Sequence, residues 1–148
     1  MSITKRHERQ YPLVAFLRFG YADDAVNDVN GVPGDGSDNE VIDLPAGAIV
    51  TGGEVVVTTA FNTSGTGAAD VLDVGDADTE NRYLNDANLL AAGRTALVPT
   101  GYEYPTKKSL TVRRTATIGT GGAAASAGKG YIRVEYILNT GRAQEVQV

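Results

Sequence analysis

Short segments in which apolar and polar residues alternate are the feature that most constrains the fold of this chain. In residues 53–62, Val55, Val57 and Phe61 fall on one side, and Glu54 and Val56 fall on the other with mainly polar residues. The same two-residue period returns in Ser109–Ile118 and Tyr131–Leu138. Successive side chains of a strand point to opposite faces, so each segment is predicted to be a half-buried strand.

Between these segments the chain is rich in Gly and Asp, as turns are. We expect turn-rich loops at 31–39, 63–68 and 73–81, and a protruding loop at 119–130. Further short strands are expected at Val41–Leu44, Ala48–Val50, Val71–Val74 and Thr95–Val98.

One stretch, Thr79–Ala92, favours a short helix. Tyr83, Ala87 and Leu90 form a weak helical stripe there, and Gly93 follows as a stop signal.

Many short strands with almost no helix indicate an all-β protein with a single β-sandwich, jelly-roll-like, over residues 11–148. The polar residues 1–10 are expected to form an extended N-terminal arm. A length of 148 residues fits one domain. The predicted core contains Val55, Val57, Phe61, Leu110, Val112, Ile132, Val134 and Tyr136.

The residue types needed for most catalytic sites are scarce. The chain has no Cys and one His, which excludes thiolate nucleophiles and multi-histidine metal sites within one chain. His7 lies in the polar arm, where a surface role is the simpler interpretation. We therefore expect no enzyme, no catalytic, cofactor-binding or metal-binding residues, and no cofactor or small-molecule substrate.

Two motifs resemble binding sites but depart from the required patterns. In AAASAGKG, Ala123 stands where a phosphate-binding loop needs Gly, and Gly130 where it needs Ser or Thr. The acids in 35–40 and 70–80 lack the spacing of an EF-hand loop. These acids are interpreted as solvated turn residues, with a structural cation as the alternative.

Charge is unevenly distributed along the chain. Residues 20–93 carry many acids against Arg82 alone, whereas both ends are basic. An acidic surface repels a phosphate backbone, so no nucleic-acid partner is expected. No apolar tract is long enough to span a membrane, and the polar start does not resemble a secretory signal.

The segment Tyr11–Phe19 is apolar on both faces, since Val14 and Phe16 alternate with Leu13 and Leu17. Such a strand must be covered on both sides, which implies either a central position in the sandwich or a subunit interface.

Tyr102 and Tyr104, beside Lys107 and Lys108, fit a protein interface or a locally packed strand edge.

Five runs of sequence carry a resemblance over residues 40–142. They are VIDLPAGAIVTGGEVVVTTAFN (41–62), VLDVGDADTENRYL (71–84), LLAAGRTALVPTG (89–101), TKKSLTVRRTATIG (106–119) and GKGYIRVEYILNTGR (128–142). In their order and amino-acid sequence they resemble the head decoration, or cement, proteins of tailed bacteriophages, which have a β-sandwich of jelly-roll type.

The resemblance implies a non-enzymatic virion protein that is made in the host cytoplasm. Its partners would be the major capsid protein and further copies of itself, as a homotrimer at three-fold and quasi-three-fold positions. It would bind the outer surface of the expanded capsid and stabilise the shell by bridging capsomers. The expected contact residues, in the arm, the first strand and the tyrosine segment, are Lys5, Arg6, Arg9, Tyr11, Leu13, Phe16, Leu17, Arg18, Phe19, Tyr102 and Tyr104.

Two alternatives remain open from the sequence. One is another virion component, such as a tail-tube, head-completion or fibre protein. The other is a carbohydrate-binding β-sandwich, which would need exposed aromatic platforms, and the chain has no Trp. On the decoration hypothesis, Leu17→Asp is expected to leave the sandwich partly folded but to prevent assembly.

Overall fold

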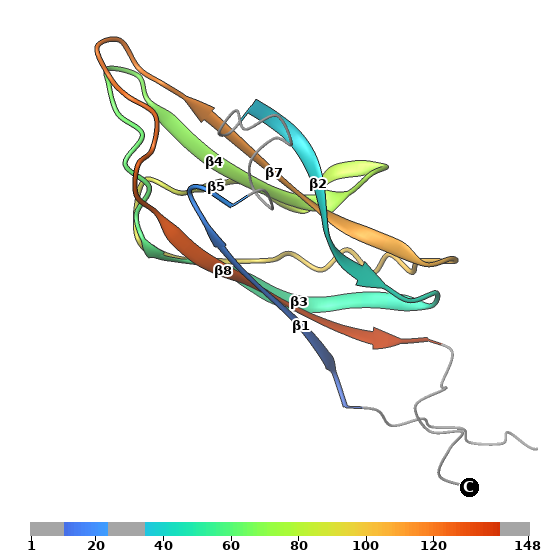
Figure 1. Cartoon of the computed structure of the whole chain (residues 1–148). Helices are drawn as coiled ribbons and strands as arrows, with labels where there is room; N and C mark the ends of the chain where they lie inside the picture. Colours follow the sequence, from blue (N-terminus) through green and yellow to red (C-terminus); the bar gives the residue numbers. More distant parts are fainter. Residues whose placement is uncertain (1–10, 24–34, 140–148) are drawn as a thin grey trace, which may run out of the picture.

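The protein folds into two antiparallel four-stranded sheets that face each other as a sandwich (Figure 1). The computed structural model describes residues 11–23 and 35–139. Sheet A has the order β1-β8-β3-β6 and sheet B the order β2-β7-β4-β5. The strands are β1 (Leu13–Gly20), β2 (Asp35–Leu44), β3 (Ala48–Thr59), β4 (Ala69–Asp76), β5 (Thr79–Asn88), β6 (Gly93–Ala96), β7 (Lys108–Thr117) and β8 (Lys129–Leu138).

The pairing of the strands is that of a jelly roll. The first strand pairs with the last and the second with the seventh, so the chain winds through both sheets as a folded-over hairpin. The third strand pairs with β6 and β8, and the fourth with β5 and β7. The predicted all-β sandwich is therefore confirmed, whereas the predicted arm, residues 1–10, lies outside the described residues.

The core lies between the two sheets, where the predicted alternation places it. Of the residues predicted for the core, Val55, Ile132 and Val134 are at most 1% exposed, and Tyr136 packs against the core from its margin. The other predicted core residues, Val57, Phe61, Leu110 and Val112, are buried as well.

The helix predicted for Thr79–Ala92 is wrong, because this stretch begins with strand β5. Leu84 pairs with Val74 and Ala87 pairs with Leu72, so two residues, Asn85 and Asp86, stand opposite one residue of β4, and β5 has one extra residue. Such a bulge changes the spacing of inward residues from two to three, which imitates a helical stripe. The described ranges contain no helix long and apolar enough to cross a membrane.

Two predicted loops are largely strand. Asp35–Leu44 forms β2, so only the first part of the predicted loop 31–39 lies outside this strand. The predicted loop at 73–81 is a tight hairpin between β4 and β5. Its turn is closed by Asp76, whose Oδ1 accepts hydrogen bonds from the N–H groups of Asp78 (3.0 Å) and Thr79 (2.9 Å).

The two remaining glycine-rich segments, 63–68 and 119–128, lie together at one end of the sandwich (Figure 1, upper left). An isolated bridge joins Thr66 and Thr120 there. A Cβ atom on Gly122 would lie 1.8 Å from the carbonyl oxygen of Ser64, so only glycine permits this approach. The glycine content of these loops is therefore needed for close backbone packing.

Candidate interaction surface

Strand β1 lies at an edge of sheet A, so the central position considered for Tyr11–Phe19 is wrong. Its odd-numbered residues face the core: Phe19 is 2% exposed, and Ala15 and Leu17 pack against the core. The even-numbered residues point outward. Val14 is 56% and Phe16 51% exposed, a large apolar exposure for one strand.

An aromatic stack extends this apolar strand across the outer face of sheet A. The ring of Phe16 stacks on that of Tyr131 in β8, with centroids 4.9 Å apart. The guanidinium of Arg18 lies 5.6 Å from the Phe16 centroid, within the range of a cation–π contact. We call the side chains of Val14, Phe16 and Arg18, which are exposed, and of Tyr131, which is half-buried, the β1 surface. A pre-stacked aromatic pair beside an arginine is typical of protein interfaces.

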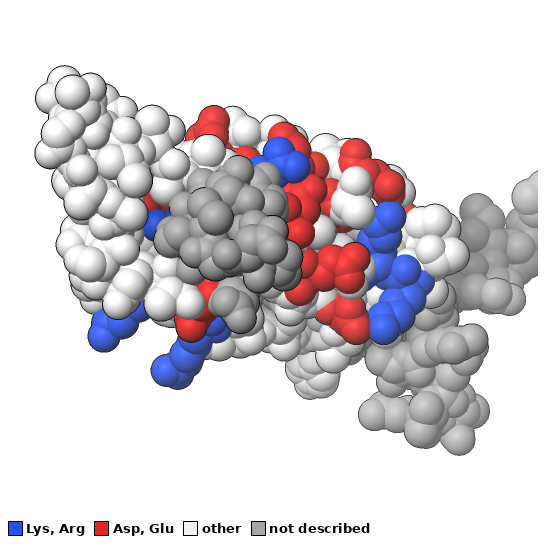
Figure 2. All heavy atoms as spheres, turned by 45° about the horizontal axis from the view of Figure 1, so that its top comes forward, with Lys and Arg blue, Asp and Glu red and all other residues white. Residues whose placement is uncertain are grey.

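The outer face of sheet B has the opposite character. Figure 2 shows a band of Asp and Glu side chains across the face above this sheet. At its centre Arg113 of β7 forms ion pairs with Asp38 of β2 (2.8 Å) and with Glu80 of β5. We call this region, which also carries Glu40, Asp43, Asp73, Asp78 and Asp86, the acidic face.

Asp73 is the most enclosed carboxylate of the acidic face, at 8% exposure. Burial raises its pKa above the ordinary value, and the charges of Asp86 and Glu80 add to this rise. Its Oδ1 accepts a hydrogen bond from the N–H of Asp86 (2.6 Å), which opposes the rise. Asp86 itself adopts a left-handed backbone conformation, with φ of 54°. The bulge in β5 therefore supplies a hydrogen bond to Asp73.

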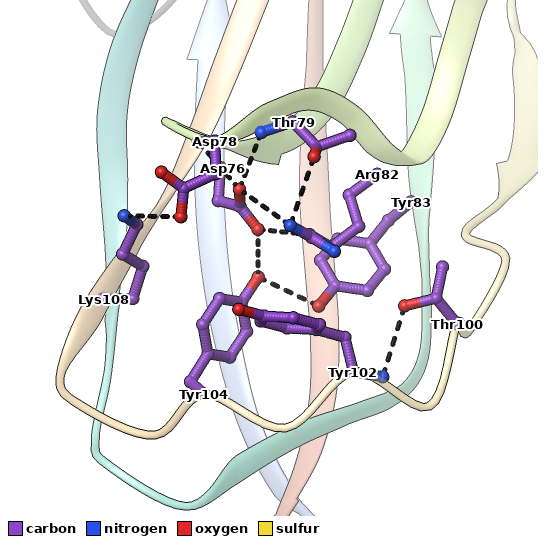
Figure 3. Close-up of polar contacts among 9 residues, drawn as sticks. All are labelled: Asp76, Asp78, Thr79, Arg82, Tyr83, Thr100, Tyr102, Tyr104 and Lys108. Carbon is purple, nitrogen blue, oxygen red and sulfur yellow. Dashed lines mark hydrogen bonds and ion pairs between the residues drawn. The ribbon is translucent and has the colours of Figure 1, made fainter.

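A buried polar cluster lies under the β4–β5 hairpin (Figure 3). The carboxylate of Asp76, fully buried, accepts hydrogen bonds from Arg82 Nε (2.5 Å) and from the hydroxyl of Tyr104 (2.7 Å). The hydroxyls of Tyr83 and Tyr104 lie 2.9 Å apart. The ring of Tyr102 covers the Arg82 guanidinium at 3.9 Å from its centroid. Every member of this cluster has a partner, so the cluster is structural.

The pKa values in this cluster follow from burial and hydrogen bonding. Burial raises the pKa of Asp76, but the hydrogen bonds from Arg82, Tyr104 and Thr79 together outweigh it, and the net pKa lies below the ordinary value. Burial raises the pKa of Tyr104, and the hydrogen bonds with Tyr83 and Asp76 raise it further. Both tyrosines are therefore neutral donors near neutral pH.

A second buried ion pair joins β4 and β7 inside sheet B. Arg114 donates to both oxygens of Asp70, from Nε at 2.7 Å and from a terminal nitrogen at 2.6 Å, and both side chains are fully buried. The hydroxyl of Thr63 donates to the same carboxylate at 2.6 Å. The guanidinium also lies 4.5 Å from the Phe61 ring centroid.

The structure separates the predicted contact residues into groups. Tyr11, Leu13, Phe16 and Arg18 are exposed, and Leu17 is half-buried on the core side of β1. Tyr102 is 36% exposed. Phe19 and Tyr104 lie in the core, so we leave them out of the surface proposed below. Lys5, Arg6 and Arg9 lie outside the described residues.

Sequence reasoning omitted Val14 and Tyr131 from the contact residues. Both follow the outward phase of their strands, which was visible in the alternation. The stacking of Tyr131 on Phe16 was not visible, because β1 and β8 lie at opposite ends of the chain.

The acidic groups do not form a recognisable metal site. Within residues 11–23 and 35–139, no three His, Cys, Asp or Glu side chains are arranged to hold a metal ion. Asp70 and Asp76 point into the core towards arginines, whereas Asp73 lies on the acidic face. The group 70–80 is therefore divided between two faces of β4.

The fold is similar to that of chains in three phage capsid structures. A chain in the capsid asymmetric unit of cyanophage Pam1 has a TM-score of 0.61 and 17% identity, covering 93% of this chain and 94% of that chain. A chain in the acidic stable capsid structure of Helicobacter pylori bacteriophage KHP30 has a TM-score of 0.59 and 19% identity, covering 87% and 89%. A chain in the capsid of Ralstonia phage GP4 has a TM-score of 0.55 and 17% identity, covering 93% and 90%.

At these identities the likeness concerns the fold. No protein-family model matches the chain, and no curated protein is significantly similar to it in sequence. The predicted resemblance to phage head proteins is thus confirmed in the fold, over almost the whole chain.

Proposed function

We propose that the protein is a structural protein of a tailed-phage virion that decorates the outer surface of the expanded capsid. The observation that carries this proposal is the jelly-roll fold, which chains from three phage capsid structures share over 87–93% of this chain. The five sequence runs, whose order resembles that in decoration proteins, support the proposal independently of the fold.

The β1 surface is the part of the molecule that would contact the shell. Val14 and Phe16 are half exposed in the isolated chain, and burying such side chains contributes roughly 25 cal/mol per Å² of apolar area. Arg18 and the stacked Tyr131 add directional contacts. The partner surface that fits is an apolar patch of the major capsid protein with a carboxylate at its rim.

The acidic face would then point away from the shell, because the outer faces of the two sheets look in opposite directions. Placing many carboxylates against the medium keeps decorated particles apart by charge repulsion. This orientation would explain why the acidic residues are concentrated on one face of the molecule.

Homotrimers that bridge capsomers would bind the shell more tightly than a single subunit with the same contacts. When one subunit of a trimer is bound, the others bind at a high effective concentration. A protein that binds only the expanded shell also stabilises that state by mass action. Both effects support a bridging role.

The proposal is tested by mixing the purified protein with expanded, undecorated shells and sedimenting them. The wild type is expected to sediment with the shells and to raise their resistance to heat. Val14→Asp is expected to reduce binding at least about tenfold, since it places a charge within the β1 surface. Val98→Asp is the matched control, because Val98 is also exposed (65%) but belongs to no strand.

Two results would overturn the proposal. One is failure of the wild type to sediment with the expanded shells, whereas equal binding by Val14→Asp and Val98→Asp would exclude the β1 surface as the contact. The other is density for this chain in the tail or at the neck of an intact particle, which would favour a tail-tube, fibre or head-completion role.

A further inference from the structure

A strand at the edge of a sheet exposes backbone N–H and C=O groups that another strand can pair with, and proteins normally protect such edges. Within residues 11–23 and 35–139, the sandwich has four edge strands: β1 and β6 in sheet A, and β2 and β5 in sheet B. Strand β6 is protected by its length of four residues. Strands β2 and β5 are each interrupted by two register shifts.

Strand β1 has none of these protections. Its register with β8 runs through eight consecutive pairs without a shift, and it contains one charged residue and no proline. A regular, apolar edge of this length is a template for an added strand.

The hydrogen-bond pattern shows which groups of β1 face the open side. The N–H of Tyr21, which follows β1, donates to the carbonyl of Gly128 at 3.0 Å. Hydrogen-bonded pairs alternate along an antiparallel ladder, so the odd-numbered residues of β1 bond to β8. The backbone groups of Val14, Phe16 and Arg18 therefore point away from β8. No hydrogen bond to these groups is present within the described residues.

Both ends of this open edge are closed. Pro12 is the preceding residue whose backbone groups would point away from β8, and proline has no N–H to donate. At the other end, the N–H of Gly20 donates to the carboxylate of Asp23 at 2.5 Å. The open edge consists of three residues centred on Phe16.

We propose that this edge is occupied by β1 of a second copy of the chain, in an antiparallel pair whose two-fold axis passes beside Phe16. In this register Phe16 lies opposite Phe16 of the second copy, and Val14 lies opposite Arg18. Every N–H and C=O of the open edge then has a partner. A shift by two residues in either direction would bring Pro12 or Gly20 into the ladder and lose donors.

The side chains agree with the same register. On the outer face no like charges meet, because Arg18 lies beside Val14 of the other copy. On the core side, Leu13 pairs with Phe19, and Ala15 with Leu17. Leu13 is 39% exposed in the single chain, and a neighbouring apolar strand would cover it. The two sheets A then join into one continuous sheet.

The pairing of two copies goes beyond the proposed function. It uses the backbone edge of β1 and leaves the side chains of the β1 surface available to contact the shell. Joining two copies doubles the β1 surface on one side of the joined sheet. In a decorated shell the contact would link copies of neighbouring trimers. The pairing is tested in solution without shells, so its failure and that of shell binding are distinguishable.

The first test measures mass by light scattering over a concentration series. The wild type is expected to form dimers, or even-numbered assemblies when three-fold contacts are also present. Val14→Pro removes an N–H from the open edge and leaves the hydrogen bonds between β1 and β8 intact. It is expected to weaken the pairing of the two copies at least about tenfold. Val14→Ala, which keeps the N–H, is the control and should pair more strongly than Val14→Pro.

The second test uses the absence of cysteine from the chain. In the proposed register the two Cα atoms at position 16 lie about 5.5 Å apart, a distance that a disulfide spans. Phe16→Cys is expected to form a disulfide-linked dimer under mild oxidation. Arg18→Cys is not, because its two copies lie roughly 14 Å apart along the strands. A monomeric or strictly trimeric wild type, or equal cross-linking at both positions, would overturn the pairing.

Discussion

The inner faces of the two sheets, which meet in one core, are built from different residues. The inner face of sheet A is formed by aliphatic side chains such as Val55, Ile132 and Val134. That of sheet B carries Asp70, Asp76 and Arg114 among its leucines and valines, and all three are at most 1% exposed. Among the residues that the structure describes, buried charge on the inner faces is therefore confined to sheet B.

The difference indicates a division of tasks. In sheet B the buried ions hold specific segments: Asp70 joins β4 to β7 and to Thr63, and Asp76 joins the β4–β5 hairpin to Tyr104. Sheet A needs no such contacts, and its unusual residues, Val14 and Phe16, lie on the outside. Sheet B fixes the geometry of the sandwich, and sheet A carries the surface proposed for assembly.

The largest effect on stability is expected from Arg114→Ala. This change leaves the buried carboxylate of Asp70 without its arginine, which costs about 3–5 kcal/mol of unfolding free energy. Urea unfolding measures the loss. Arg113→Ala is the matched control, since the neighbouring side chain points to the acidic face and should cost less than about 1 kcal/mol. Similar losses for both variants would mean that the buried ion pair inside sheet B stabilises the fold no more than the ion pairs on its outer face.

The next effect separates the two faces of β1. Leu17→Asp puts a carboxylate on the core side and is expected to cost about 2–3 kcal/mol. This loss agrees with the expectation that the variant is only partly folded, and it makes the variant unsuitable as a test of assembly. Phe16→Asp, one residue away on the outer side, is expected to cost about 0.5–1 kcal/mol. Thermal unfolding of both variants measures the contrast. Equal losses of stability would mean that position 16 is as buried as position 17.

The pH dependence of folding is expected to depend on Asp76. Its pKa in the folded protein lies below the unfolded value near 4, so its ionised form stabilises the fold. This contribution is complete above the unfolded pKa and is lost as the pH falls through the folded pKa. Asp76→Asn should lower the unfolding free energy by about 1–2 kcal/mol at pH 7 and by less at pH 3.

The control for this variant is Asp78→Asn in the same hairpin. Asp78 is 64% exposed and pairs with Lys108 at the surface, so its loss should change the unfolding free energy by less than about 0.5 kcal/mol. If both variants lose the same stability at pH 7 and pH 3, Asp76 is not the group responsible.

The sequence predicted the apolar parts of the fold better than the charged parts. Alternation identified Val55 and Ile132 as core residues, because burial of a regular strand face follows a period of two. The same rule failed in β5, where the bulge at Asn85 and Asp86 changed the spacing. A bulge depends on pairing with another strand, so local sequence does not contain it.

The site residues show the same limit. Arg114 occupies an inward position between apolar neighbours, but its partner Asp70 lies 44 residues earlier in the chain. Tyr104 was predicted at an interface from the nearby lysines, whereas its hydroxyl is held by Asp76, 28 residues away. Alternation showed that β1 is apolar on both faces, but only the topology shows that it is an edge strand.

The smallest expected effect is a gain in stability from Asp73→Asn on the acidic face. Burial raises the pKa of Asp73, so its ionised form opposes folding near neutral pH, and its contribution favours the fold only at low pH. Asparagine keeps an oxygen that accepts the hydrogen bond from the N–H of Asp86. The variant should gain up to about 0.5 kcal/mol at pH 7 and nothing at pH 3, as measured by urea unfolding. A loss at pH 7 would mean that the ion pairs around Arg113 outweigh the burial of this carboxylate, and that the acidic face stabilises sheet B.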